Sequence, residues 1–424
     1  MSLVVGFLGM THLGLNSAVA GAERGHKIVC FDYESDYIAS LRRANSFIEE
    51  PNLSKLLKKN LHLMNFTDCD EKLRQCDLVY IAADVDTDEH GASDLSPVET
   101  YLDTAIKNTN DETTLVVLSQ VPPGFVRSHK KPNRQIAYQV ETLIFGNAIS
   151  RALNPERYII GLDNADSKLP RELKSYLESH GNPPIFKMSY ESAELAKTAI
   201  NCCLVSSIST ANMFAEICEH IGANWQDIVP ALRADKRIGQ YSYLSPGLGL
   251  SGGNLERDVK TVIEIANTFE AKANIAQSWL DHSNLRRNWP LEMIASHVFP
   301  ENQSPVIGIL GLTYKENTNS IKNSPSVKLI KELRKYKLQV YDPIISCDPA
   351  WHETIENKES VKQTCLGADV ILIMTAWPEF HGLKCNKISR WMRGTVVIDP
   401  FSILNSADAH AAGLKHIVLG KKLK

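Results

Sequence analysis

A lysine and an asparagine have the types and spacing to act on a reacting oxygen atom. Lys197 and Asn201 are four residues apart in the stretch 192–220, where apolar residues recur every three or four positions and predict a long helix. Both side chains would project from one face of that helix. An ammonium and an amide that converge on one point can stabilise negative charge developing on oxygen. A solvated lysine and a surface asparagine are the alternative that the spacing leaves open.

A glycine-rich segment, 237–258, follows this predicted helix. Its five glycines, among them Gly249 and Gly252, allow positive φ angles and close approach to a ligand. Arg237 begins the segment and Asp258 ends it. The composition predicts a loop that clasps a ligand. The stretch from Asp258 to Arg287 is predicted to form another long helix.

The start of the chain carries a second pattern with chemical meaning. An apolar run at 3–8 is followed by a glycine turn, a predicted helix to residue 24, and a strand at 27–32 that ends in Asp32. The turn contains Gly9, Thr11, His12, Leu13 and Gly14. This order is typical of a dinucleotide site, although Thr11 stands where the second glycine is usual and a plain turn is the alternative. Asp32 can accept from a ribose 2′-hydroxyl and would repel a 2′-phosphate, which favours NAD over NADP.

The elements that position these residues alternate between strands and helices. Further strands are predicted at 77–82, 114–118, 306–311, 338–343, 368–374 and 395–399. Such alternation indicates parallel, doubly wound sheets, with ligands beyond the carboxyl ends of the strands. Ser119 and Gln120 follow one such end. We predict an α/β fold in which two Rossmann-like doubly wound domains are joined by a central helical region containing the long helix, with domains at 1–188, 189–295 and 296–424.

Composition bounds the possible partners. The 424 residues suffice for two or three domains, and the net charge of −3 gives no bulk attraction to nucleic acid or to an anionic membrane. No apolar run approaches the ~20 residues of a membrane span. Nine unevenly spaced cysteines and a start without a leader pattern favour a reducing cytoplasmic setting. No Cys/His cluster suggests a metal.

The motifs together resemble the UDP-glucose/GDP-mannose dehydrogenase family. Matches in the glycine-rich segment and just before it are Asp235, Arg237, Ile238, Gly239, Pro246, Gly247, Gly249, Gly252 and Asp258. Elsewhere the family's Glu-Pro-x-Leu appears at 50–53, its Glu-x-x-Lys-x-x-x-Asn at 194–201, and its Phe-Lys motif at 312–315, which ends in Lys315. The resemblance spans residues 6–399.

The resemblance implies a cofactor, a substrate and roles for particular residues. It implies NAD in the first domain, a dimer core with the active-site loop in the second, and a nucleotide sugar, UDP-linked rather than GDP-linked, in the third. Glu141 would take part in proton handling, Ser119 and Gln120 would lie near the cofactor, and Lys315 would contact the nucleotide. Arg237 would reach the substrate of the neighbouring subunit of a homodimer. The implied pathway is polysaccharide or glycan precursor synthesis in the cytoplasm.

Departures from the family pattern bear on the reaction. Asn254 occupies the position of the family's catalytic cysteine. At other matching positions Phe145 replaces a glutamate, Gln120 replaces a threonine, and Lys322 and Phe401 replace arginines. The cysteine supplies the nucleophile for a covalent second oxidation, whereas an asparagine only donates and accepts hydrogen bonds.

We therefore expect an NAD-dependent nucleotide-sugar dehydrogenase with altered chemistry, such as a single two-electron oxidation. A non-catalytic paralogue that binds NAD or a sugar nucleotide is the alternative. A 3-hydroxyacid-type dehydrogenase is disfavoured by the second nucleotide-type domain. The closing lysines at 421–424 are expected to be a solvated tail.

Overall fold

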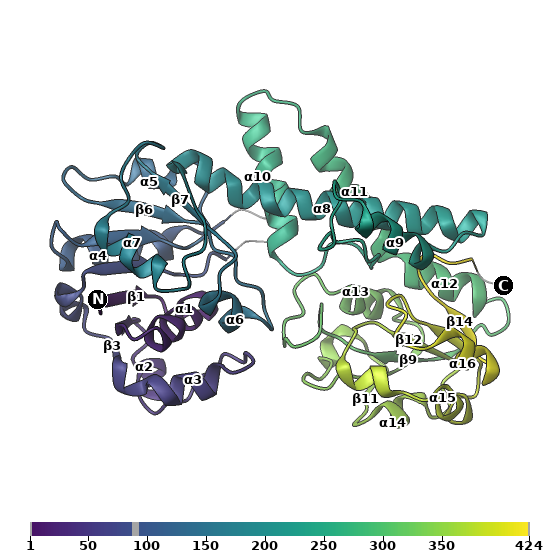
Figure 1. The fold of residues 1–424 in the computed structure, drawn as a ribbon. Helices are drawn as coiled ribbons and strands as arrows, with labels where there is room; N and C mark the ends of the chain where they lie inside the picture. Colours follow the sequence, from purple (N-terminus) through teal and green to yellow (C-terminus); the bar gives the residue numbers. More distant parts are fainter. Residues whose placement is uncertain (1, 87–92, 423–424) are drawn as a thin grey trace. The chain divides into compact units, whose positions relative to one another are not determined.

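Two β-sheets, one in each half of the chain, carry the fold (Figure 1). The computed structural model describes residues 2–86 and 93–422. The chain divides into two compact units, Met1–Ile200 and Asn201–Lys424. Each unit is described by itself below.

The first unit is built on an eight-stranded sheet ordered β3-β2-β1-β4-β5-β6-β7-β8. Neighbouring strands run parallel except β6 and β7, which are antiparallel. The strands are Val4–Leu8 (β1), Lys27–Phe31 (β2), Met64–Thr67 (β3), Leu78–Ile81 (β4), Thr114–Val117 (β5), Ile136–Gln139 (β6), Tyr158–Leu162 (β7) and Ile185–Ser189 (β8). The central strands β1 and β4 are apolar throughout, as expected for a parallel sheet covered on both faces.

Helices cover both faces of this sheet. They are His12–Glu23 (α1), Ser35–Leu41 (α2), Leu53–Asn60 (α3), Ser96–Asn108 (α4), Phe125–Ser128 (α5), Ala148–Leu153 (α6) and Arg171–Glu178 (α7), with short 3₁₀ turns at Leu61–Leu63 (η1) and Asp70–Gln75 (η2). Phe7 of β1 belongs to the apolar cluster that contains Leu15 of α1, whereas the next residue, Leu8, belongs to the cluster that contains Val98 of α4. Alternate residues of one strand therefore fill two separate cores.

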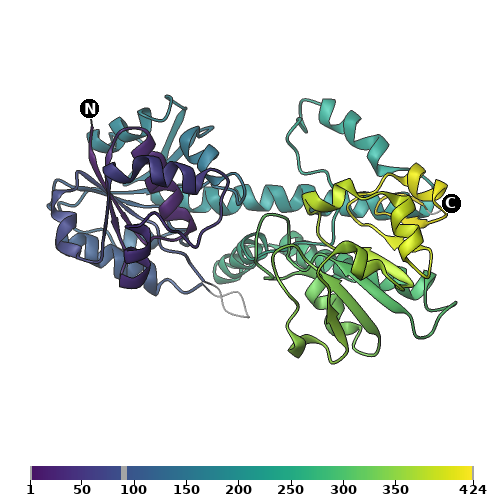
Figure 2. The ribbon, with the colours of Figure 1, turned by 90° about the horizontal axis from the view of Figure 1, so that it is seen from below.

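One helix, Tyr190–Ile221 (α8), has 32 residues and confirms the long helix predicted over 192–220. It runs without a break in both views (Figures 1 and 2). Lys197 and Asn201 are one turn apart on it, on opposite sides of the boundary between the two units.

The second unit combines helices with a six-stranded parallel sheet ordered β11-β10-β9-β12-β13-β14. Its strands are Val306–Leu310 (β9), Lys337–Tyr341 (β10), Ile355–Asn357 (β11), Val370–Ile373 (β12), Val396–Ile398 (β13) and Lys415–Ile417 (β14). Its helices are Trp225–Ala234 (α9), Asn254–Thr268 (α10), Asn274–Arg287 (α11), Trp289–His297 (α12), Pro325–Glu332 (α13), Val361–Cys365 (α14), Cys385–Trp391 (α15) and Ser406–Ala411 (α16), with 3₁₀ turns Pro349–Trp351 (η3) and Pro378–Gly382 (η4). The α/β class with two Rossmann-like domains and a central helical region is thereby confirmed. The three domain boundaries stay a prediction.

The single helix predicted from Asp258 to Arg287 is wrong. α10 ends at Thr268 and α11 begins at Asn274. Glu270 between them has φ +55°, a left-handed conformation that interrupts an α-helix. α10 also begins at Asn254, so Asn254 and Asp258 are four residues apart on one helix and share a face. No helix within residues 2–86 and 93–422 is both long and apolar enough to cross a membrane.

Candidate functional site

The glycine turn between β1 and α1 is closely packed. Gly9 has φ +92°, and a Cβ there would lie 3.1 Å from the backbone of Ala82. A Cβ on Gly14 would overlap the carbonyl oxygen of Gly9. Thr11, at the second glycine position, caps α1: its Oγ1 accepts from Gly14 N at 3.3 Å and donates to Ala82 O at 2.8 Å. The threonine is therefore a helix cap in this turn.

Asp32 lies just beyond the end of β2 and holds the same turn. Its Oδ2 accepts from Met10 N at 2.6 Å, and its Oδ1 accepts from Glu34 N at 3.1 Å. The first turn of α1 has no acidic residue, so its amide groups and helix dipole favour a bound phosphate. These features fit a dinucleotide, with Asp32 beside the turn where a ribose hydroxyl would be recognised.

A buried glutamate connects this turn to a distant loop. Glu50, whose side chain is 1% exposed, accepts from His12 Nε2 at 2.7 Å, from Gly146 N at 2.7 Å and from Ala148 N at 3.3 Å. Phe145 packs on the His12 ring, with ring centroids 4.0 Å apart. His12 thus joins the head of α1 to the 145–148 loop. Sequence reasoning assigned Glu50 no such contact; the Glu-Pro-x-Leu signature was its only signal.

The turn after β5 is tied to neighbouring elements. Ser119 is buried and its Oγ donates to Ala83 O at 2.7 Å, while Gln120 beside it is half-buried. Glu194 of α8 accepts from Gly124 N at 2.6 Å and from Val126 N at 2.8 Å. Burial raises the pKa of Glu194. The glutamate of the Glu-x-x-Lys-x-x-x-Asn motif is therefore an anchor for the turn that carries Ser119 and Gln120.

Lys197 and Glu141 meet in the first unit. Lys197 Nζ lies 3.0 Å from the Glu141 carbonyl oxygen and 3.4 Å from its carboxylate Oε2. The amide of Leu143 donates to the other carboxylate oxygen. These contacts place an ammonium beside a carboxylate, the pair needed for proton handling and for stabilising charge on oxygen.

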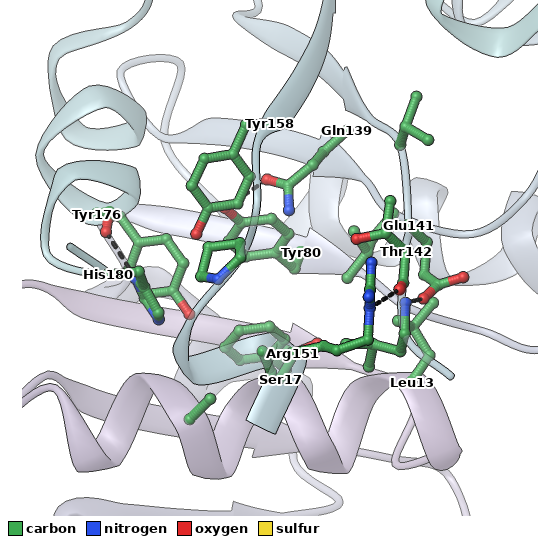
Figure 3. Close-up of a pocket in the computed structure, with 17 residues that line it drawn as sticks. Leu13, Ser17, Tyr80, Gln139, Glu141, Thr142, Arg151, Tyr158, Tyr176 and His180 are labelled. Atoms are coloured by element: carbon green, nitrogen blue, oxygen red, sulfur yellow. Dashed lines mark hydrogen bonds between the residues drawn. The ribbon is translucent and has the colours of Figure 1, made fainter. Parts of the chain in front are cut away.

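Glu141 also lines a pocket between α1 and a group of tyrosines (Figure 3). Leu13 lies on the α1 side, and Tyr80, Tyr158 and Tyr176 lie on the other. Of the predicted site residues, Leu13 and Glu141 line this pocket, whereas Gly9, Asp32 and Lys197 do not. The pocket therefore adjoins the Glu141 loop and shares Leu13 with the cofactor turn.

Asn201 and Asp258 meet in the second unit. The amide nitrogen of Asn201 donates to Asp258 Oδ2, and Arg257 Nε lies 3.2 Å from Asp258 Oδ1. The Asp258 side chain is 1% exposed. These donors orient the carboxylate, which lies one helical turn from Asn254 on α10.

That Asn254 takes the place of the family's catalytic cysteine stays a prediction from the resemblance. Cys202 follows Asn201 directly in the sequence and packs beside an apolar cluster that contains Val205 and Val259. Burial, and then the Asp258 charge, raise the pKa of Cys202 to about 11, so this thiol is protonated at neutral pH. Among the described residues no group of His, Cys, Asp and Glu could hold a metal.

The glycine-rich loop is backed by a segment of the C-terminal sheet domain. Gly252 has φ +76°, and a Cβ there would lie 2.9 Å from the ring of Tyr314. Gly252 N donates to Lys322 O at 3.1 Å, and the Lys322 side chain lies against Gly253. Asn323 Nδ2 donates to Gly252 O at 3.0 Å. Lys322 is thus placed next to the start of α10.

Three other predicted substrate residues lie in the second unit. Gly249 has φ +77°, and a Cβ there would overlap the backbone of Ser283. Lys315 Nζ lies 5.8 Å from the centroid of the Tyr314 ring. Arg237, 88% exposed, pairs with Asp235 at 2.6 Å and holds the pKa of that carboxyl below its usual range.

Comparisons with known proteins agree with this arrangement. Family models match residues 3–177 (UDP-glucose/GDP-mannose dehydrogenase family, NAD binding domain), 191–284 (central domain) and 308–406 (UDP binding domain). A UDP-glucose 6-dehydrogenase of Rickettsia typhi is 28% identical over 98% of this chain and 99% of its own. The NAD cofactor predicted from the turn and Asp32 is thereby confirmed.

Solved structures share the fold. A UDP-D-ManNAc dehydrogenase from Pyrococcus horikoshii has a TM-score of 0.85 at 22% identity and covers 99% of each chain. A UDP-glucose dehydrogenase from Pyrobaculum islandicum has a TM-score of 0.85 at 23% identity, covering 100% of this chain and 98% of its own. With family models of one family matched along the chain, the protein belongs to the UDP-glucose/GDP-mannose dehydrogenase family of NAD-dependent oxidoreductases, which act on a CH–OH group of a nucleotide sugar.

Proposed function

We propose that this protein is a nucleotide-sugar dehydrogenase that carries out a single two-electron oxidation, from a sugar CH–OH group to a carbonyl. The observation that carries the proposal is the environment of Asn254. It is the first residue of α10, one turn before the buried Asp258, and has an amide in place of a thiol. Cys202, whose pKa is raised to about 11, offers no thiolate in its stead.

The first oxidation needs groups that this chain retains. Bound NAD would supply the acceptor for the hydride that leaves the sugar carbon, and the hydroxyl proton would pass to water. Lys197 and Asn201, one turn apart on α8, stabilise the developing alkoxide in this proposal. Asp258, oriented by Asn201 and Arg257, holds the water that takes the proton, and Glu141 sets the position of the Lys197 ammonium.

The covalent route to an acid lacks its nucleophile. That route forms a thiohemiacetal from a cysteine thiolate and then a thioester that water hydrolyses. An amide nitrogen forms neither, because its lone pair is delocalised into the carbonyl. Asn254 can instead hydrogen-bond the carbonyl product or its hydrate.

The test is the number of NADH molecules formed for each sugar consumed, with NAD in excess. UDP-glucose is the first substrate, followed by a panel of UDP- and GDP-sugars. One NADH and a carbonyl product support the proposal. Two NADH and an acid would overturn it and require a second oxidation without a thiol.

A non-catalytic paralogue is the second candidate. Phe145, at the position of a family glutamate, packs on His12, and this apolar contact favours a binding protein with a changed site. Measurable NAD binding without turnover across the sugar panel would support this candidate against the first.

We further propose a UDP-sugar as substrate. The model matched over 308–406 is described as a UDP binding domain, and Lys315 and Tyr314 lie within that range. Competition between UDP and GDP for the purified protein distinguishes the two, with UDP expected to bind more tightly.

We also propose a cytoplasmic location, in keeping with nine free cysteines.

A homodimer is proposed from an apolar strip on α8. Met213, Phe214, Ile217 and Ile221 recur at helical spacing and are 41–71% exposed, and such strips mark protein interfaces. Ile217→Glu should shift the molar mass measured by light scattering toward a monomer. Ile344→Glu, at a 45% exposed isoleucine away from α8, is the matched control. A monomeric parent protein would contradict the proposal.

A further inference from the structure

A basic pocket is lined by residues of α16 and of the segment 416–422. Its volume is about 180 Å³, and its polar lining consists of Ser406, His410, His416, Lys421 and Lys422. The described residues that line it include no carboxylate. Four groups that can carry positive charge therefore surround one hydroxyl in a chain whose net charge is −3.

A buried carboxylate supports the pocket from behind. Asp399 and His416 have fully buried side chains, and Asp399 Oδ2 lies 3.1 Å from His416 Nε2. The other ring nitrogen, Nδ1, lies 3.1 Å from Ser406 Oγ. Asp399 Oδ1 is buried and has no hydrogen-bond partner among residues 2–86 and 93–422.

The two lysines are held in place. Trp225 N donates to Gly420 O at 2.9 Å, and Gly420 N donates to Glu219 Oε1 at 2.9 Å. Lys421 forms a β-bridge with Asn224. The solvated tail predicted for 421–424 is therefore wrong for Lys421, whose backbone bridges to the residue before α9, whereas Lys422 is exposed, as predicted; residues 423 and 424 lie outside the described part.

We propose that this pocket is a binding site for a phosphoryl group. A water molecule takes about 30 Å³ in the liquid, so the pocket has room for a phosphate ion or a small phosphate monoester. In this proposal the ammonium groups of Lys421 and Lys422 donate to the anion, and the Ser406 hydroxyl, which can rotate, donates to it as well. The region matched as a UDP binding domain ends at residue 406, and most of this lining lies beyond it, so the inference is independent of the dehydrogenase reaction.

Binding fits the pocket better than hydrolysis by a serine nucleophile. A Ser–His–Asp set also needs amide groups to stabilise an oxyanion. The amides of Ala407 and Asp408, next to Ser406, both donate to the Asn405 side chain at 2.9 and 3.1 Å. These two amide groups therefore already have an acceptor in the helix cap and do not point to an oxyanion site.

The proposal is tested by titrating the full-length protein with inorganic phosphate and measuring the heat of binding by calorimetry. The double variant Lys421→Ala/Lys422→Ala should weaken binding about tenfold or more, since charge-assisted hydrogen bonds are lost. The control Lys384→Ala/Lys387→Ala removes the same charge from exposed positions at α15 and should change affinity less than about twofold. Ser406→Ala should also weaken binding; it removes the partner of His416 Nδ1 and should lower the melting temperature as well, so its binding is measured at a temperature at which the variant is folded.

A second arm uses glycerol 3-phosphate to separate the two sources of the phosphoryl group. Tighter binding of this monoester than of phosphate would identify a phosphorylated metabolite as the ligand, and the reverse order would identify the free ion. Absence of phosphate binding to the parent protein, or equal losses in the two double variants, would overturn the proposal.

Discussion

Removal of Glu50 should loosen the loop that carries Phe145 and lower the stability of the first unit. The Glu50 carboxylate is buried and accepts three hydrogen bonds, from His12, Gly146 and Ala148. A buried donor left without its acceptor costs about 1–3 kcal/mol, so the loss of one acceptor group shared by three donors costs about 3–5 kcal/mol after partial relaxation. Glu50→Ala should therefore destabilise the unit by about that amount.

Glu50→Gln gives a graded version of the same change. The oxygen that serves His12 and Gly146 can stay an acceptor, but the new amide nitrogen then faces the Ala148 N–H, which is also a donor. One hydrogen bond to a charged group is lost, which costs about 1.5–3 kcal/mol. For a unit of this size each 1 kcal/mol of lost stability lowers the melting temperature by about 2–4 °C. We therefore expect the melting temperature to fall by about 6–20 °C in Glu50→Ala and by about 3–12 °C in Glu50→Gln.

Hydrogen exchange measured by mass spectrometry locates the effect. The amides of Gly146 and Ala148 should lose protection in both variants, because their acceptor is removed or altered. Glu49→Gln, at the exposed neighbouring residue, is the matched control and should change neither protection nor melting temperature. Unchanged protection at 146–148 in Glu50→Ala would refute the reasoning.

Three further predictions concern the reaction and the thiols. Lys197→Ala should lower kcat about 100-fold or more, because one positioned donor is removed, and should leave NAD affinity nearly unchanged; a kcat equal to that of the control Lys174→Ala, at an exposed lysine of α7, would contradict its role. Asn254→Cys should not by itself raise the yield to two NADH per sugar, because Phe145 and Gln120 also differ from the family; complete acid formation would show that the rest of the site was already competent. The thiol of Cys202, with its pKa raised to about 11, should resist iodoacetamide at neutral pH and react as pH approaches 11, after the exposed Cys203; alkylation of both at equal rates at pH 7 would contradict that shift.

Local patterns in the sequence predicted much of the architecture. The strand, glycine turn, helix and acid around Gly9, Gly14 and Asp32 form a contiguous unit, and the structure shows why the two glycines are required. Apolar periodicity located α8 to within two residues at its start and one at its end. Both signals lie within contiguous stretches of the chain, so they can be recognised without knowledge of the fold.

Contacts between distant segments could not be predicted in this way. Glu50 accepts from an amide 96 residues away, and no periodicity encodes that pairing. The break between α10 and α11 depends on the left-handed conformation of Glu270, a residue type that ordinarily favours helix. The partners of Lys197 and Asn201 likewise became visible in three dimensions, as Glu141 and Asp258.

The two bonds that Asp32 makes to backbone amides bear on attempts to engineer the cofactor preference. The usual design for accepting a 2′-phosphate replaces the acid after β2 with a small or basic residue. Here that replacement would also remove the acceptor for Met10 N and Glu34 N. Variants from a library built at this position would therefore be selected for an intact turn as strongly as for binding of the new cofactor. Asparagine keeps an oxygen for Met10 while it removes the negative charge, which makes Asp32→Asn, combined with a basic residue elsewhere near the turn, the better starting point for such a library.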